Sequence, residues 1–451
     1  MAVDIIDRVV LREFNGQEVR AGELVIKLIQ FIRHTIRSGD ECVIDRGLDD
    51  VPNAVHIEEL AGGIGHELGK LCGHLHTGVE HIAFAACFAA ARAVRLTVMG
   101  EPSTDTRRYI HCLTRLVQIN SVNPDLSTTG QGEREIAEYI HHHFQLLEIP
   151  SEIHTVIDDR CNTTAILAGE DKDRILLLNG HIDTVGVEGM DDPFTLKKSG
   201  DRLYGRGTYD MLAGCAIQMA LANYFSQHPC PITLVFTFVA DEENMSIGME
   251  HLVEHFIPVL SVKPFLGIFL EPTEEHIGIS HKGFAWFEVE IKGLAAHGSR
   301  PEQGVNAIFP LSYALKELET INQELATEKP HPFLGHATLH PGLISGGSAQ
   351  SVIAAHSKLN WERRILPGDR QEKLDGELQR VISAVENANG DQKIVGRQIF
   401  SRPPNESSDN KLIRKLKQAA GDKDYCGMSY WADSALAAQA GIPSILFGPA
   451  G

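Results

Sequence analysis

Four acidic or histidine-containing motifs each follow an apolar, strand-like run, and this repetition is the feature that most constrains the fold. The motifs are His181-Ile182-Asp183, Asp210 after a Gly-x-Gly turn, the pair Glu242-Glu243, and Glu271 before a proline. An open α/β sheet presents its site at the carboxyl ends of its strands. The repetition therefore predicts an α/β sheet with one shared site. A fifth motif, Ala296-His297-Gly298, comes later in the chain.

The predicted fold class is α/β, with a mostly parallel sheet that carries helices on both faces. Apolar runs at 175–178, 233–239 and 267–270 have the length and composition of strands buried on both faces. Amphipathic or apolar stretches predict helices at 107–117, 133–147 and 211–225, and the pattern returns near residue 399 with a helix at 410–420 and a strand at 444–447.

A chain of 451 residues is long enough for two or three domains. Residues 1–100 are expected to form an extension, with helical spacing at 24–36 and an Ala-rich stretch at 64–96 that could hold one or two helices. Residues 101–282 and 396–451 are expected to form one α/β domain. Alternating residues from Phe287 to Ile291, followed by helices at 305–321 and 371–388, predict a small α+β domain at 283–395.

The composition argues against several classes of partner and location. A formal net charge of -19 disfavours nucleic acid and anionic membrane as partners. The eight cysteines have no paired spacing, which suits a reducing compartment. The N-terminus lacks a signal-peptide pattern, and the longest apolar stretch, 82–91, is too short to span a bilayer. A soluble cytoplasmic protein is expected.

Each motif has a structural and a chemical interpretation. The period of two places His181 and Asp183 on one face of a strand, as in a metal ligand supported by a carboxylate, although a turn role is common for this pattern. Asp210 precedes a helix, so it is either a helix cap or a bridging metal ligand. Neighbouring acids such as Glu242 and Glu243 point in different directions, so one can bind a metal while the other accepts a proton, although a solvated loop is the usual role of such a pair alone. A buried strand that ends in Glu271 is explained by a metal, and a surface turn is the alternative.

The order of these motifs resembles that of a metallopeptidase and deacylase family. This family contains acetylornithine deacetylase, succinyl-diaminopimelate desuccinylase, aminoacylase and glutamate carboxypeptidase, and the resemblance covers residues from about 106 to 451. The matching segments are Gly180-His181-Ile182-Asp183-Thr184-Val185, Gly205-Arg206-Gly207-Thr208-Tyr209-Asp210-Met211, Ala240-Asp241-Glu242-Glu243, Leu270-Glu271-Pro272-Thr273, Ala296-His297-Gly298-Ser299-Arg300-Pro301 and Trp361-Glu362-Arg363-Arg364-Ile365-Leu366-Pro367-Gly368.

The resemblance implies two divalent metal ions, with zinc as the first choice and cobalt or manganese as alternatives. It implies that His181 and Glu271 hold one metal, that Asp210 bridges to the second, and that Glu243 holds the second. Glu242 is then the general base and Asp183 steadies the site. The family commonly has a cis peptide bond directly after the bridging aspartate, at Asp210-Met211 in this sequence.

The resemblance also assigns the α+β insertion as a lid and dimerisation domain, which implies a homodimer. His297 is then expected to stabilise the oxyanion, often in the partner's active site, and Arg364 to grip the substrate carboxylate. A surface ion pair is the alternative for Arg364. Ser351 stands where the family usually has a substrate-binding asparagine, so it is the corresponding candidate for substrate binding.

The family supplies one more histidine to the second metal shortly after a Gly-Pro-x-Gly segment, which is Gly448-Pro449-Ala450-Gly451 at the end of this sequence. We expect the sequence to continue to such a histidine.

The predicted activity is hydrolysis of amide bonds in N-acyl amino acids or small peptides, as in acetylornithine deacetylase. A dipeptidase or carboxypeptidase and a non-catalytic ligand-binding relative are the alternatives.

In the extension, His66, His74 and His81 could share a helical face, where a structural or solvated role is favoured over a metal site.

Overall fold

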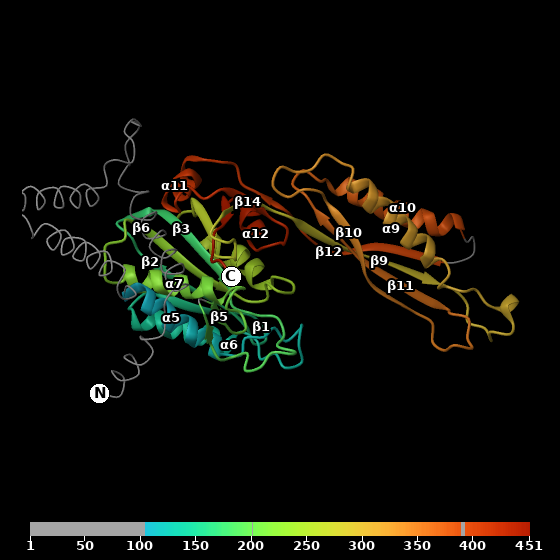
Figure 1. Ribbon diagram of the computed structural model, residues 1–451, viewed down its shortest axis with the longest axis horizontal. Coiled ribbons are helices and arrows are strands. Elements are labelled where there is room, and N and C mark those ends of the chain that lie inside the picture. The colour runs from blue at the N-terminus through green and yellow to red at the C-terminus, as the bar shows by residue number, and fades with distance from the viewer. Residues whose placement is uncertain (1–103, 201, 389–392) are drawn as a thin grey trace, which may run out of the picture. The chain divides into compact units, whose positions relative to one another are not determined.

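The computed structural model describes residues 104–200, 202–388 and 393–451 (Figure 1). The expectations for the extension at 1–100 fall outside these described residues. They include the helical stretches at 24–36 and 64–96 and the histidine group around His74.

A nine-stranded sheet forms the larger part of the described fold. Its centre is parallel, because β3 pairs in parallel with both β6 and β7, and β7 pairs in parallel with β15. Antiparallel pairs flank this centre, so the sheet is mixed as a whole. The strand order is β1 (Ser151–Ile157), β2 (Arg160–Leu167), β6 (Ile232–Val239), β3 (Asp171–His181), β7 (Leu266–Phe269), β15 (Ser444–Leu446), β8 (Ile277–His281) and β13 (Asn405–Glu406), with β14 (Tyr425–Met428) beside β8.

Helices cover both faces of this sheet, as the sequence predicts (Figure 1). Side chains alternate along a strand, so Leu176 and Leu178 pack into one core while Ile175 and Leu177 pack into the other. The first core contains α5 (Thr104–Gln118), α6 (Arg134–Leu146), α7 (Leu212–Phe225) and α11 (Lys411–Ala419), and the second contains α8 (Ile247–His251), η1 (Leu252–Phe256), η2 (Ile257–Val259) and α12 (Ser434–Gln439). A small hairpin of β4 (Lys197–Ser199) and β5 (Arg202–Tyr204) completes this unit.

A second, antiparallel sheet forms the lid domain. Its strand order is β10 (Thr338–Gly346), β11 (His356–Ile365), β9 (Gly283–Lys292) and β12 (Lys393–Arg402). The helices α9 (Leu311–Leu325) and α10 (Gln371–Ala388) pack on this sheet, and a short turn, η3 (Pro301–Gln303), precedes them. β12 pairs with β9 along its length and so runs across the boundary expected at residue 395. The helix expected from residue 305 begins at Leu311, directly after Pro310, which lacks a backbone N–H.

The helix α7 is almost wholly buried and packs closely against the backbone that leads from β7 to Glu271. Twelve of its 14 residues are buried. At Gly214 a Cβ atom would lie 2.4 Å from the backbone oxygen of Leu270, the residue before Glu271. Glycine is therefore required for this approach.

None of the helices within the described ranges is both long and apolar enough to cross a membrane.

This packing leads to a stability prediction. Replacing Gly214 with alanine should destabilise the protein by about 1–3 kcal/mol, because the added methyl group forces the helix away from the Leu270 backbone. Gly376 in α10 is the matched control, since it has open space around it and alanine there should stabilise the helix by up to about 1 kcal/mol. Urea unfolding of both variants measures the two changes. Equal effects in the two variants would contradict the packing argument.

Candidate metal centre

Three of the predicted motifs lie at the same edge of the sheet because they follow parallel neighbouring strands. His181 is the last residue of β3, Glu242 and Glu243 come shortly after β6, and Glu271 comes shortly after β7. β3 lies between β6 and β7. The carboxyl ends of these strands therefore bring the side chains together, as the sequence predicts.

The imidazole of His181 is the centre of the group and is 1% exposed. Its Nε2 atom lies 3.0 Å from Oδ1 of Asp210. The same nitrogen lies 3.9 Å from Oε2 of Glu242 and 3.9 Å from Oε1 of Glu271. One ring nitrogen thus faces three carboxylates that come from three separate segments of the chain.

Asp210 is delivered by the glycine turn and the start of α7. The Asp210–Met211 peptide bond is cis, which confirms the expectation from the resemblance, and Gly207 has a φ of 75°. The N–H of Leu212 donates to the oxygen of Gly207 at 2.8 Å, which fixes the turn before the helix. The Met211 sulfur accepts from the N–H of His181 at 3.2 Å. The loop that carries Asp210 is therefore bonded directly to the end of β3.

Asp183 fixes the loop that carries the two glutamates. Its carboxylate accepts hydrogen bonds from the backbone N–H of Glu242 at 3.0 Å and of Glu243 at 3.2 Å. Its Oδ1 atom also lies 3.4 Å from Nδ1 of His181. Burial alone would raise the pKa of Asp183, but the hydrogen bonds from His181 and Asn123 and from the Glu242 backbone hold that pKa below its usual value. Asp183 is thus an ionised acceptor that orients His181 and the loop together.

The other acids of the site are destabilised in their charged form. Burial, together with Glu271 and Asp433, raises the pKa of Glu242 well above its usual range, and burial, Asp210 and Asp433 do the same for Glu271. Burial and the charges of Asp210 and Asp183 raise the pKa of Glu243 to about 7. Burial alone would lower the pKa of His181, but hydrogen bonds to Asp183 and Asp210 raise it well above 6.5. The site therefore favours either protonation of these acids or a bound cation that compensates their charge.

One buried acid of this site, Asp433, was not among the predicted site residues. It stands at the N-cap position of α12 without a side-chain cap bond, and both its oxygens are buried without a hydrogen-bond partner among the described residues, although the Ser246 hydroxyl is near. Burial raises its pKa to about 7, although His181 lowers it. An aspartate that precedes a short apolar helix looks like an ordinary helix cap in sequence. One sequence therefore carries no signal that separates a capping aspartate from a buried acid of the site.

The residues fit a divalent metal ion by the chemistry of their donors. Ligand atoms of His181, Asp210 and Glu243 all lie within 4.8 Å of one another. One imidazole nitrogen and several carboxylate oxygens form a donor set that suits zinc and also manganese or cobalt. The distance of Glu271 from His181 is compatible with a further carboxylate ligand. The structure thus places together the four predicted metal ligands, and their individual roles stay predictions.

The three lid residues make their contacts within the lid domain. His297 is exposed, and its Nδ1 atom pairs with the Ser299 hydroxyl at 2.8 Å. The backbone oxygen of Ser351 accepts from the Gly298 N–H at 2.7 Å, so the segments of His297 and Ser351 are neighbours. Arg364 forms an ion pair with Glu362 at 2.7 Å and lies over the ring of Phe284. Their roles in catalysis and substrate binding stay predictions, as does dimerisation through the lid.

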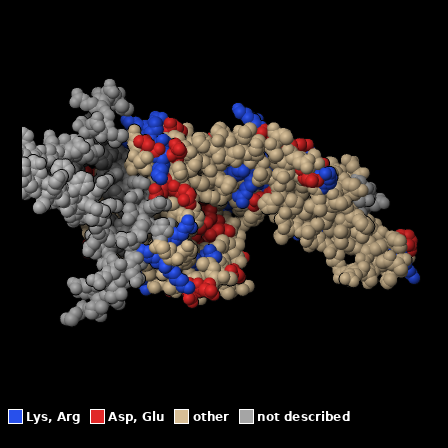
Figure 2. Space-filling view, viewed as in Figure 1, with Lys and Arg blue, Asp and Glu red and all other residues tan. Residues whose placement is uncertain are grey.

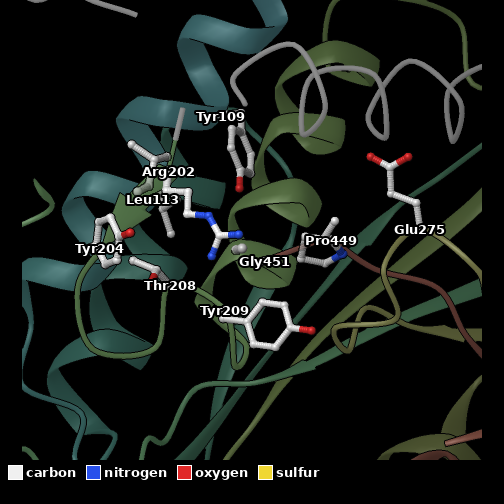
Figure 3. Close-up of a pocket in the computed structure, with 12 residues that line it drawn as sticks. Tyr109, Leu113, Arg202, Tyr204, Thr208, Tyr209, Glu275, Pro449 and Gly451 are labelled. Atoms are coloured by element: carbon white, nitrogen blue, oxygen red, sulfur yellow. The ribbon is translucent and has the colours of Figure 1, made fainter. Parts of the chain in front are cut away.

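A cavity of about 230 Å³ lies between α5, the loop after β5 and the segment Pro449–Gly451. Figure 3 shows the guanidinium of Arg202 and the hydroxyl of Tyr109 pointing into it. None of its described lining residues is a predicted metal ligand. Its lining does include Tyr209, the residue before Asp210. In the space-filling view, Asp and Glu side chains gather at the surface of the α/β unit (Figure 2).

The pKa values predict how metal and pH act on stability. Glu243 and Asp433 have folded pKa values of about 7, above those of free carboxyl groups, so the metal-free folded state binds more protons than the unfolded state between about pH 4.5 and 7. Stability of the metal-free protein should therefore fall as pH rises through this window. Bound zinc should reverse the fall, because it binds the deprotonated groups. Thermal unfolding between pH 5 and 8, with chelator and with zinc, measures this, and parallel curves would contradict it.

The described fold is similar to that of solved peptidases. It matches a tripeptidase from Staphylococcus aureus at a TM-score of 0.60 and 18% identity, over 76% of this chain and 89% of that one. It matches a dipeptidase from Saccharomyces cerevisiae at a TM-score of 0.60 and 14% identity, over 76% of this chain and 88% of that one. A Bacillus subtilis protein described as a dinuclear metal-binding peptidase of the M20 family matches at a TM-score of 0.54 and 16% identity, over 75% and 87% of the two chains.

Sequence comparison identifies the family. The acetylornithine deacetylase of Proteus mirabilis is 27% identical over 352 residues, which span 76% of this chain and 88% of the relative. That of Photorhabdus laumondii is 30% identical over 266 residues, which span 56% and 67%. The sequence model of peptidase family M20/M25/M40 matches residues 177–451, more than half of the chain and all five motifs. The chain therefore belongs to peptidase family M20/M25/M40.

Proposed function

We propose that this protein is a metal-dependent amide hydrolase that removes the acyl group from an N-acyl amino acid. The observation that carries the proposal is the arrangement around His181, where one buried imidazole nitrogen lies within 3.9 Å of Asp210, Glu242 and Glu271. The similarity to acetylornithine deacetylases over 352 residues supports the substrate class.

His181, Asp210, Glu243 and Glu271 would hold two divalent ions, with zinc as the first choice. The solved relative described as dinuclear supports the number of ions. When bound, such ions polarise the amide carbonyl and lower the pKa of water. Asp183 keeps the imidazole of His181 oriented, because its backbone oxygen accepts a hydrogen bond from Nδ1 at 3.0 Å and its Oδ1 atom lies 3.4 Å from the same nitrogen.

Glu242 would act as the general base and then as the general acid. Its side chain is 11% exposed, and its Oε2 atom lies 3.9 Å from Nε2 of His181, farther than Oδ1 of Asp210 at 3.0 Å. Burial raises its pKa above the usual range, and a carboxyl with a raised pKa is a stronger base that can accept a proton from water and return it to the leaving amine. Bound cations would lower that pKa from its value in the metal-free site.

The lid would supply groups that recognise the substrate. We assign His297 to the oxyanion and Arg364 to the substrate carboxylate, with Ser351 beside His297. Arg364 already holds one carboxylate, that of Glu362, with its Nε atom. A substrate carboxylate therefore has to compete with this ion pair or use the remaining guanidinium nitrogens.

A substrate panel tests this proposal. The full-length protein, loaded with zinc or cobalt, is assayed against N-acetylornithine, other N-acyl amino acids and dipeptides, with chelator as the control. We expect hydrolysis of N-acyl amino acids that is lost with chelator and returns with metal. Faster hydrolysis of dipeptides would replace the deacylase assignment with a dipeptidase. Metal binding without hydrolysis of any amide would instead support a non-catalytic relative.

The assignment of the base has its own test. Glu242→Gln should lower kcat by about 10²–10⁴-fold, because the amide cannot accept the proton from water. Zinc binding should be retained, since Glu242 is not one of the assigned ligands. Glu254→Gln is the matched control, because Glu254 is an exposed glutamate whose side chain is 70% accessible. Isothermal titration with zinc and steady-state kinetics measure the two quantities. Unchanged kcat in Glu242→Gln would remove this residue from the mechanism.

A further inference from the structure

A buried asparagine, Asn123, joins the two loops that carry the site. It lies between α5 and α6 and is 0% exposed. Its Nδ2 atom donates to Oδ2 of Asp183 at 2.8 Å and to Oδ1 of Asp241 at 2.9 Å. Its Oδ1 atom accepts from the N–H of Asp125 at 3.0 Å. Both donors and the acceptor of this amide are therefore used, and both donors go to carboxylates.

The two acids that Asn123 binds hold the glutamate loop from opposite ends. Asp183 accepts from the N–H groups of Glu242 and Glu243. Asp241 has a φ of 67°, and its Oδ2 atom accepts from the N–H groups of Met245 at 3.3 Å and of Ile247 at 3.5 Å. Because Asp183 follows β3 and Asp241 follows β6, one amide group links the ends of two strands.

Of the two acids that Asn123 binds, Arg160 binds only Asp241. Its Nη2 atom lies 2.7 Å from Oδ1 of Asp241, and its guanidinium also binds Glu133 at 2.6 and 2.7 Å. Among the described residues, Arg160 makes no hydrogen bond or ion pair with Asp183. Asn123 thus links Asp183 to Asp241, the acid that Arg160 binds, through a neutral amide group.

We propose that Asn123 is a positioning residue for the reaction, which sets the spacing between Asp183 and Asp241 and thereby the directions of Glu242 and Glu243. This inference rests on the proposed function for its kinetic consequence. Its structural content concerns the loop that carries both the proposed base Glu242 and the proposed metal ligand Glu243. A residue that only filled space would affect stability without changing the geometry of the metal ligands.

The test compares Asn123→Ala with Asn120→Ala in the full-length protein. Asn120 is the matched control, because it lies in the same loop and donates to the Thr129 backbone oxygen instead of to a carboxylate. We expect Asn123→Ala to lose about 10- to 100-fold in kcat, as for other groups that support metal ligands, with KM within about twofold. The visible absorption spectrum of the Co²⁺ form should shift, because Glu243 changes its direction. Asn120→Ala should leave both unchanged.

Several outcomes would overturn the proposal. A folded Asn123→Ala with the wild-type kcat and Co²⁺ spectrum, changed only in its unfolding temperature, would show that Asn123 is structural. Equal losses in Asn120→Ala would have the same meaning. If Asn123→Ala does not fold, Asn123→Ser keeps one donor and should give an intermediate kcat and a shifted spectrum. Wild-type values in Asn123→Ser would then overturn it.

The Co²⁺ spectrum separates failure of this inference from failure of the proposed function. If the wild-type protein hydrolyses no amide, the proposed function fails, yet the spectra of the wild type and Asn123→Ala still decide the role of Asn123. A shift that occurs in Asn123→Ala and not in Asn120→Ala supports positioning. Identical spectra contradict it.

Discussion

Repulsion between buried carboxylates is the constraint on which the site depends. Glu242 and Glu271 are each within 3.9 Å of the same imidazole nitrogen as Asp210, and Asp433 lies buried nearby without a hydrogen-bond partner among the described residues. Like charges in a poorly solvated space cannot all be ionised without a compensating cation. The fold tolerates this group because Asp183 and the neighbouring backbone hold it in place. Burying several carboxylates together costs free energy if they serve structure alone. A site for metal ions explains the arrangement, because bound cations would compensate their charge.

The fold and the centre of the site were predictable from the sequence for a simple geometric reason. Apolar runs such as 175–178 and 233–239 marked the buried strands, and parallel strands bring their carboxyl ends to one edge. His181, Glu243 and Glu271 therefore met at this edge, whereas Asp210 comes from the glycine turn before α7 and was expected there from the family resemblance. The lid domain was also recognisable from the alternation that begins near Phe287, although its fourth strand extends across the boundary expected at residue 395.

Other features were not predictable because their signals are not local. Asn123, Arg160 and Asp433 come from a loop, an antiparallel strand and a helix start that are far apart in the sequence. Each has an ordinary local interpretation as a turn residue, a surface charge or a cap. Only the three-dimensional arrangement shows that Asn123 binds two acids at once. The roles of His297, Ser351 and Arg364 depend on a bound substrate, so they remain predictions.

The adjacency of Glu242 and Glu243 has a consequence for how such a protein can diversify. The proposed base and the proposed metal ligand share one peptide unit, and both N–H groups are held by the same aspartate. A backbone shift that moves one of these glutamates also moves the other, so the positions of the proposed base and of the proposed metal ligand are coupled through this loop. Adaptation to a new substrate is then left to surfaces that are not tied to this loop. Substrate range can change in the lid while the centre that performs the chemistry stays the same.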